Sequence, residues 1–379
     1  MSSSRQATGI YVHIPFCSEK CNYCDFLSAP GSEAQMESYL ALLASEAKRW
    51  HGRYEAATVF IGGGTPSLLP APMLDRFLAE VVEPFLPARR VEATIECNPE
   101  SFSAEKADVL VRRGIGRVSF GVQSFEPDEL TSLGRRHDRE RAVAAYLEAR
   151  DAGIEDVNLD LIYGFPGNGL DAWRRSLDAA IELGPDHLSA YCFILEEGTK
   201  FFHAHQAGAL PDEDPDLHAD LFDVARARLA EAGYTHYEIS NFAQPGRECQ
   251  HNRRYWRNDT YLGLGLGAVS FLEGRRRTNA RTHAAYGKQV EAGLPYETIE
   301  EELSADERVR ESLILGLRLL EGVDPTCVTG SPLGDPEYAQ IVKTLGRWEQ
   351  KGLLARHGER WALTERGLFL SNEVFTDLI

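Results

Sequence analysis

The most constraining feature of this sequence is the alternation of short apolar runs with helical stretches through its first two-thirds. The runs lie at residues 10–14, 58–61, 91–96, 117–120, 156–162 and 187–193. Segments with helical apolar spacing, such as 71–85 and 139–152, separate them. Six successive β/α units predict an α/β fold with a parallel sheet buried on both faces. The pattern allows an open sheet and also a partial (β/α)6 TIM-like barrel.

Three cysteines, Cys17, Cys21 and Cys24, directly follow the first predicted strand. Thiolates at this spacing suit an iron–sulfur cluster in which one iron has no protein ligand. A structural zinc site normally has four protein ligands, and Asp25, Phe26 and the residues next to them supply no further Cys or His. A zinc knuckle and three unrelated thiols are the alternatives. The number of ligands favours the cluster.

Polar or glycine residues mark the ends of the next predicted strands. They are the glycine run at 62–64 with Thr65 after the second strand, Glu96 and Gln123 at the third and fourth, and Asp160 in the fifth. Each has an ordinary explanation alone, as a turn or a helix cap. Because the carboxyl ends of parallel strands share one edge of the sheet, their joint placement predicts a single ligand site there.

Composition excludes several classes of protein. The formal net charge of -18 argues against a nucleic-acid partner, since the only dense basic run is the short one at residues 275–277. No apolar run approaches the roughly 20 residues that span a bilayer, and residues 1–9 lack the apolar core of a signal peptide. The seven cysteines do not read as a secreted disulfide framework. We therefore expect a cytoplasmic protein.

Several motifs together resemble one known family. They are YVHIPFC at 11–17, the cysteine spacing, GGGTP at 62–66, GVQSF at 121–125 and DLIYG at 160–164. These motifs resemble those of the radical S-adenosylmethionine (SAM) proteins related to oxygen-independent coproporphyrinogen III oxidase. Phe26 stands where the oxidase pattern has a further cysteine, and HNRRYW at 251–256 is similar to the His-Asn-x-x-Tyr-Trp motif of the heme chaperone (HemW) branch.

The resemblance implies a [4Fe–4S] cluster on the three cysteines and SAM on the open iron. The SAM site that it implies consists of Tyr11 and Tyr23 near the adenine, backbone groups of Gly64 and Thr65 near the methionine part, and Glu96 near the ribose or methionine. Glycines suit this role because, without Cβ atoms, their N–H groups can approach a ligand directly.

Three further residues, Gln123, Arg135 and Asp160, match a second SAM site of the oxidase. Two other roles for Arg135 stay open. It could form an ion pair with Asp160, or its planar fork could bind a porphyrin propionate.

The resemblance also implies heme as a ligand and heme-accepting proteins as partners. His251 is the candidate axial ligand, Tyr255 and Trp256 could stack on a macrocycle, and Cys249 is an alternative ligand. A packed structural histidine is the plain alternative for His251. Peripheral membrane association and a homodimer are compatible with this picture. The competing functions are coproporphyrinogen III oxidation and a cluster-bearing scaffold.

The β/α pattern stops after residue 271. Residues 304–321 and 336–350 have helical spacing, residues 353–363 read as a hairpin, and a last helix starts at Thr364. This order resembles a small winged-helix-like domain. The expected division is a partial barrel at 1–240, a connecting segment at 241–302 and the C-terminal domain at 303–379.

Overall fold

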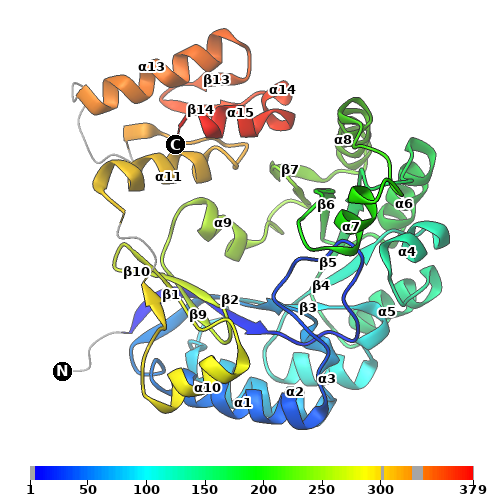
Figure 1. Ribbon diagram of the computed structural model, residues 1–379, viewed down its shortest axis with the longest axis vertical. Helices are drawn as coiled ribbons and strands as arrows, with labels where there is room; N and C mark the ends of the chain where they lie inside the picture. The colour runs from blue at the N-terminus through cyan, green and yellow to red at the C-terminus, as the bar shows by residue number, and fades with distance from the viewer. Residues whose placement is uncertain (1–4, 300–302, 327–335, 379) are drawn as a thin grey trace.

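The computed structural model describes residues 5–299, 303–326 and 336–378. A curved sheet of twelve strands runs through most of the chain, and a smaller unit with its own two-stranded hairpin lies at the C-terminal end (Figure 1). The predicted α/β class and the predicted small C-terminal domain are confirmed.

Six parallel strands form the centre of the sheet in sequence order. They are β1 (Gln6–Ile14), β2 (Tyr54–Gly63), β3 (Glu92–Cys97), β4 (Arg117–Gln123), β5 (Asp156–Tyr163) and β6 (His187–Cys192). Each strand pairs in parallel with the next. Their carboxyl ends therefore lie along one edge, as the sequence predicts.

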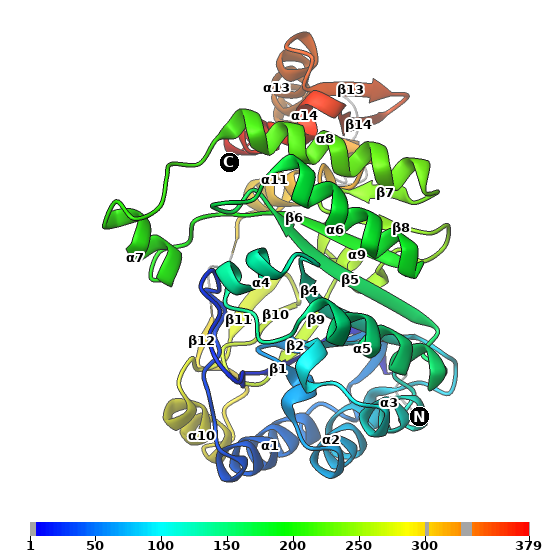
Figure 2. The ribbon, with the colours of Figure 1, turned by 90° about the vertical axis from the view of Figure 1, so that its right-hand side faces the viewer.

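Helices connect these strands and cover the outer face of the sheet (Figures 1 and 2). They are α1 (Glu33–Lys48), α2 (Ala71–Phe77), α3 (Ala104–Arg112), α4 (Pro127–Leu133), α5 (Arg139–Asp151), α6 (Leu170–Leu183), α7 (Lys200–Gln206) and α8 (Pro215–Glu231). Figure 2 shows α7 projecting from the body of the protein. The backbone N–H of Phe201 on α7 donates to the carbonyl of Asn22, 2.9 Å away. Asn22 belongs to residues 17–24, which contain the three cysteines and are called the cysteine segment below.

The first helix begins where the sequence predicts. Ser32 caps α1, and Gln35 completes a capping box by accepting from the backbone N–H of Ser32. The predicted helix at 71–85 is shorter than expected. It runs as α2 to Phe77 and then changes to π and 3-10 turns at Leu78–Val82 and Glu83–Phe85, because Pro84 has no N–H to continue the α-helical ladder.

Side chains alternate between the two faces of the parallel strands. On β5, Val157 and Leu159 are fully buried and belong to the apolar core, whereas Asn158 and Asp160 face an internal cavity. Leu43 on α1 and Phe77 on α2 are buried in the same core, and each such side chain stabilises the fold by about 1.5–3 kcal/mol. The inner face is polar, so it can bind a polar ligand.

Further strands extend the sheet on both sides. They are β7 (Thr235–Glu238), β8 (Asn241–Ala243), β9 (Tyr261–Leu264), β10 (Val269–Leu272), β11 (Arg275–Thr278) and β12 (Thr298–Ile299). Strand β9 pairs in parallel with β1, whereas β8 pairs antiparallel with β6. The edge strands β12 and β7 do not pair with each other in the described residues, so the barrel is open.

The segment at 241–302 thus shares the main sheet through β8 to β12, and it also contains α9 (Gln250–Trp256) and α10 (His283–Glu291). The C-terminal unit consists of α11 (Ala305–Gly316), α13 (Pro336–Gln350), β13 (Leu354–His357), β14 (Arg360–Leu363), α14 (Glu365–Phe369) and α15 (Ser371–Thr376). Helix α9 lies between this unit and the sheet (Figure 1).

Candidate functional site

A cavity of about 330 Å³ opens at the carboxyl ends of the parallel strands. It brings together ten of the twelve residues that the sequence predicts for the site: Cys17, Cys21, Tyr23, Cys24, Gly64, Thr65, Glu96, Gln123, Arg135 and Asp160. Tyr11 and His251 are not part of its lining. The strand-end residues therefore lie around one cavity, and their roles in binding a ligand stay a prediction.

The cysteine segment forms one wall of the cavity. The two sides of its loop are joined because the N–H of Cys17 donates to the carbonyl of Ala29 at 3.2 Å. All three thiols are free, and Cys17 is buried while Cys21 and Cys24 are half-buried. Burial raises the pKa of the Cys17 and Cys24 thiols, so loading a metal here would release protons.

No group of three or more His, Cys, Asp or Glu residues in the described ranges is arranged to hold a single metal ion. A cluster differs from a single ion because each of its thiolates binds a separate iron.

The glycine run approaches the cysteine segment closely. A Cβ atom on Gly64 would lie 2.5 Å from the Phe16 carbonyl oxygen, and Gly63 has a φ of +114°. The N–H groups of Gly64 and Thr65 are not free for a ligand, and the placement of their backbone beside SAM stays a prediction. These N–H groups donate instead to the carbonyls of Ile14 at 2.8 Å and Phe16 at 2.7 Å, because close approach of the two segments pairs these backbone groups.

Two half-buried carboxylates lie on the inner face of the sheet. Glu96 accepts a hydrogen bond from the Gly63 N–H at 3.1 Å. Asp160 accepts from Ser119 and from Asn158, each at 2.8 Å. Burial raises the pKa of Glu96 to about 7, and the nearby Asp160 adds to this shift. Burial also raises the pKa of Asp160, although hydrogen bonds from Ser189, Ser119 and Asn158 oppose the shift.

Several buried polar atoms on the cavity wall have no hydrogen-bond partner among the described residues. They are Thr94 Oγ1, Gln123 Oε1, Arg135 Nε and Asn241 Oδ1. Gln123 also has a φ of +70°, an uncommon conformation for a residue other than glycine. Unpaired buried polar atoms are costly, so these four favour a polar ligand in the cavity.

Arg135 binds the cysteine segment and the ends of two strands. Its guanidinium donates to Cys21 Sγ at 3.4 Å, to Asn98 Oδ1 at 2.8 Å and to the Gly121 carbonyl at 2.6 Å. No ion pair between Arg135 and Asp160 is found in the described part of the chain. Burial would lower the pKa of Arg135, but Tyr23, Cys21 and Glu100 raise it above the ordinary value.

His251 lies behind the cavity wall, with 1% of its surface exposed. Its Nδ1 lies 2.8 Å from Thr58 Oγ1, and its Nε2 lies 3.0 Å from the Tyr255 hydroxyl. Burial lowers the pKa of His251 to about 3, so the ring is neutral. Two neighbours, Cys249 and Asn252, do line the cavity. The motif alone could not show which of its residues faces inward.

Tyr11 also lies beside the cavity lining. His13 Nε2 donates to the Leu27 carbonyl at 2.9 Å, and its Nδ1 therefore accepts from the Tyr11 hydroxyl at 3.0 Å. Because Leu27 lies just beyond the third cysteine, Tyr11 supports the cysteine segment through His13.

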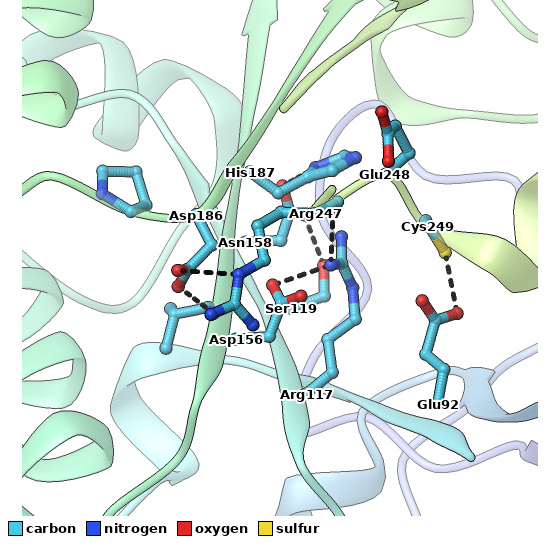
Figure 3. A network of polar contacts seen from close by, with 12 residues as sticks. Glu92, Arg117, Ser119, Asp156, Asn158, Asp186, His187, Arg247, Glu248 and Cys249 are labelled. Atoms are coloured by element: carbon cyan, nitrogen blue, oxygen red, sulfur yellow. Dashed lines mark hydrogen bonds and ion pairs between the residues drawn. The ribbon is translucent and has the colours of Figure 1, made fainter. Parts of the chain in front are cut away.

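The deep end of the cavity contains a polar network that the sequence analysis missed (Figure 3). Arg117, buried at the start of β4, donates to Asp156 Oδ1 at 2.7 Å and to the Arg247 carbonyl at 3.2 Å. Cys249 Sγ lies 3.6 Å from Glu92 Oε1, and burial moves the pKa of this thiol far above its ordinary value. The polar residues at inward positions of β4 and β5 were the signal that could have revealed this network.

Comparison with known proteins assigns the chain to a family. The Radical SAM superfamily model matches residues 11–180, and the HemN C-terminal domain model matches residues 303–370. The heme chaperone HemW of Bacillus subtilis is 35% identical over 96% of this chain and 97% of that protein. The chain belongs to the HemW family of radical SAM proteins.

Other members of the HemW family match over similar lengths. The heme chaperone HemW of Mycobacterium tuberculosis is 37% identical over 99% of this chain and 95% of its own. That of Escherichia coli is 36% identical over 96% of each chain. Among solved structures, the coproporphyrinogen III oxidase HemN from Escherichia coli, a radical SAM enzyme, matches with a TM-score of 0.85 and 25% identity, over 99% of this chain and 90% of that one.

Membership of the radical SAM superfamily implies a [4Fe–4S] cluster and SAM, and the cavity fits both. Three free thiols stand at its mouth, and unpartnered polar atoms line its wall. Its volume lies at the lower end of the ~300–1,000 Å³ that is typical of ligand pockets. No helix in the described ranges is long and apolar enough to cross a membrane.

Proposed function

We propose that this protein is a heme chaperone, which binds a [4Fe–4S] cluster, SAM and heme and passes the heme to acceptor proteins. The observation that carries this proposal is the near full-length similarity to several proteins named heme chaperone HemW. Cys17, Cys21 and Cys24 would hold the cluster. SAM would lie against the glycine run and Glu96, where the cavity offers backbone, carboxylate and amide groups.

The cofactors would supply redox and radical chemistry, and the protein would bind and orient them. Gly64 lets the glycine run pack against the Phe16 backbone because it has no Cβ atom, and Glu96 places a carboxylate beside the neighbouring Gly63. Gln123 and Arg135 keep an unpaired buried acceptor and donor on the same wall. These groups support a polar, charged ligand such as SAM.

Phe26 supports the chaperone over the oxidase. It occupies the position of the oxidase's further cysteine, lines the mouth of the cavity and is 62% exposed. An apolar ring in this position cannot ligate iron, and it offers a flat surface to an apolar ligand such as a porphyrin. The acceptor protein would then collect the heme at an open mouth.

The second candidate is radical oxidative decarboxylation of coproporphyrinogen III. The similarity to HemN over 99% of this chain favours it, and so do Gln123, Arg135 and Asp160, which line the cavity as the second SAM site requires. The two functions differ in product, so one preparation can separate them.

The experiment uses the full chain with its cluster reconstituted without oxygen. One portion receives coproporphyrinogen III, SAM and a reductant, and protoporphyrinogen is measured. Another portion is loaded with heme and mixed with a heme-free cytochrome, and the rate of heme transfer is compared with that from free heme. The proposal expects transfer without decarboxylation. Protoporphyrinogen formation over many turnovers would show that the oxidase assignment is correct instead.

A further inference from the structure

Arg135 contacts the cysteine segment in a way that neither the family resemblance nor the cluster ligands account for. We propose that Arg135 is a positioning residue for the cluster, which fixes Cys21 by a hydrogen bond and raises the reduction potential of the cluster. This inference rests on the part of the proposed function that places a cluster on the three cysteines. It does not depend on heme binding or on SAM.

The guanidinium joins three separate elements at the cavity mouth. One terminal nitrogen donates to Cys21 Sγ at 3.4 Å. The other donates to Asn98 Oδ1 at 2.8 Å, just beyond β3, and to the Gly121 carbonyl at 2.6 Å in β4. Because Asn98 and Gly121 lie at the ends of neighbouring strands, they hold the planar fork in one orientation. The sulfur of Cys21 is therefore bound to a fixed point of the sheet.

The residues just before Arg135 also contact the cysteine segment. Asn22 donates from its side chain to the Ser132 carbonyl at 2.8 Å and from its backbone to the Leu133 carbonyl at 3.1 Å. Helix α4 then ends at Gly134 with a φ of +75°, and a Cβ atom there would lie 3.1 Å from the Asn22 side chain. This left-handed turn brings Arg135 back towards Cys21, the residue before Asn22.

The electrostatic consequence follows from the charge of the guanidinium. Arginine stays protonated in proteins, so a positive charge lies beside one cluster thiolate. Hydrogen bonds to the sulfurs and the local charge set the potential of an iron–sulfur cluster. Reduction adds negative charge to the cluster, and a nearby cation stabilises that reduced form. The hydrogen bond to Cys21 acts in the same direction.

The geometry also distinguishes this role from the two others considered for Arg135, which are an ion pair with Asp160 and the binding of a porphyrin propionate. The oxygens of Asp160 are engaged by Ser119 and Asn158, and Arg135 turns instead to Cys21. Arg135 Nε has no partner among the described residues, so the side chain can bind a further ligand while it holds the thiolate. A measurement without SAM isolates the contact with Cys21.

The test is a redox titration of the cluster in the absence of SAM, followed by electron paramagnetic resonance. The full chain is compared with Arg135→Met, Arg135→Lys and the control Arg136→Met, which removes the same charge from the exposed neighbouring residue. Iron content and circular dichroism are recorded for each. For Arg135→Met we expect the ratio of reduced to oxidised cluster at a fixed potential to fall about tenfold, or ~59 mV for one electron. Arg135→Lys should show a smaller fall, and Arg136→Met none.

An unchanged potential in Arg135→Met with full iron content would overturn the proposal. If Arg135→Met folds but takes up no iron while Arg136→Met does, the positioning role is supported. If Arg135→Met does not fold, Arg135→Lys decides, and a potential equal to that of the unsubstituted chain overturns the proposal. Failure of the unsubstituted chain to bind iron would instead disprove the proposed cluster itself.

Discussion

His251 and Thr58 are joined by a buried hydrogen bond of 2.8 Å between the imidazole Nδ1 and the threonine hydroxyl. This bond anchors helix α9, which carries the His-Asn-x-x-Tyr-Trp motif, to strand β2. The other ring nitrogen, Nε2, is engaged by Tyr255. A heme iron can therefore reach Nε2 only after the Tyr255 hydroxyl has released it.

This relationship makes Tyr255→Phe an informative variant. If His251 is an axial ligand, removal of the hydroxyl frees Nε2 and should strengthen heme binding by roughly twofold to tenfold, the equivalent of one hydrogen bond. His251→Ala should weaken it. Heme titration measures both, and Tyr234→Phe, which loses a buried hydroxyl that donates to the Pro185 carbonyl, is the control. Unchanged affinity in both variants would remove His251 as a ligand.

Much of the fold could be predicted from the sequence because its central strands pair in chain order. Local patterns identify the strands, and the side chains at their ends then meet at one edge. The Ser32 cap and the cysteine spacing are local signals of the same kind. The parallel pairing of β9 with β1 is different, since it joins residues about 250 positions apart and has no local signal.

The parts of the site that could not be predicted depend on tertiary packing. The motif at 251–256 does not reveal that helix α9 turns His251 towards Thr58 and Asn252 towards the cavity. The buried Arg117 resembles any strand-start arginine until Asp156 and the Arg247 carbonyl are placed beside it. Pro84 is a local signal that the helix assignment at 71–85 did not take into account.

The carboxylate of Glu96 should make SAM binding depend on pH. Its pKa is about 7 in the folded chain and is raised above the ordinary value, so the carboxyl is neutral below pH 7 and ionised above it. SAM carries positive charge, and its affinity should therefore rise as the pH passes through about 7. Calorimetric titrations from about one pH unit below this pKa to about one unit above it measure the effect.

Two variants check the assignment of that pH dependence. Glu96→Gln should weaken SAM binding and flatten its pH dependence. Asp160→Asn should move the midpoint to lower pH, because it removes the neighbouring charge that raises the pKa of Glu96. The raised pKa of Glu96 also affects the stability of the fold. It stabilises the ligand-free fold at low pH, and this contribution should be lost as the pH rises through about 7. A pH profile that is identical in Glu96→Gln would contradict this account.

Glu321 links helix α9 to the C-terminal unit. It pairs with Arg253 and Arg257, each at 3.2 Å, and with Arg360 at 3.8 Å. Its side chain is 44% exposed, so Glu321→Gln should lower the free energy of unfolding by no more than about 1 kcal/mol. The loss should disappear near 1 M salt, where the screening length is roughly 3 Å. Denaturant titrations at low and high salt measure it. Glu349→Gln, at an exposed position of α13, is the control, and an equal loss there would exclude a specific link.

Cys21→Ala should abolish the visible absorbance of the reconstituted cluster, since two thiolates do not hold a cubane. Cys97→Ala is a matched control, because Cys97 also lines the cavity but lies outside the cysteine segment. Iron analysis and the visible spectrum check both variants. A cluster that survives in Cys21→Ala, or is lost in Cys97→Ala, would show that the ligands are assigned to the wrong residues.

The most direct test of the central claim is a heme titration of the full, cluster-loaded chain under anaerobic conditions. The account predicts a saturable change in the heme absorption spectrum that ends at one heme per chain. Absorbance that rises in proportion to added heme, with the spectrum of free heme at every step, would contradict the assignment of this protein as a heme chaperone.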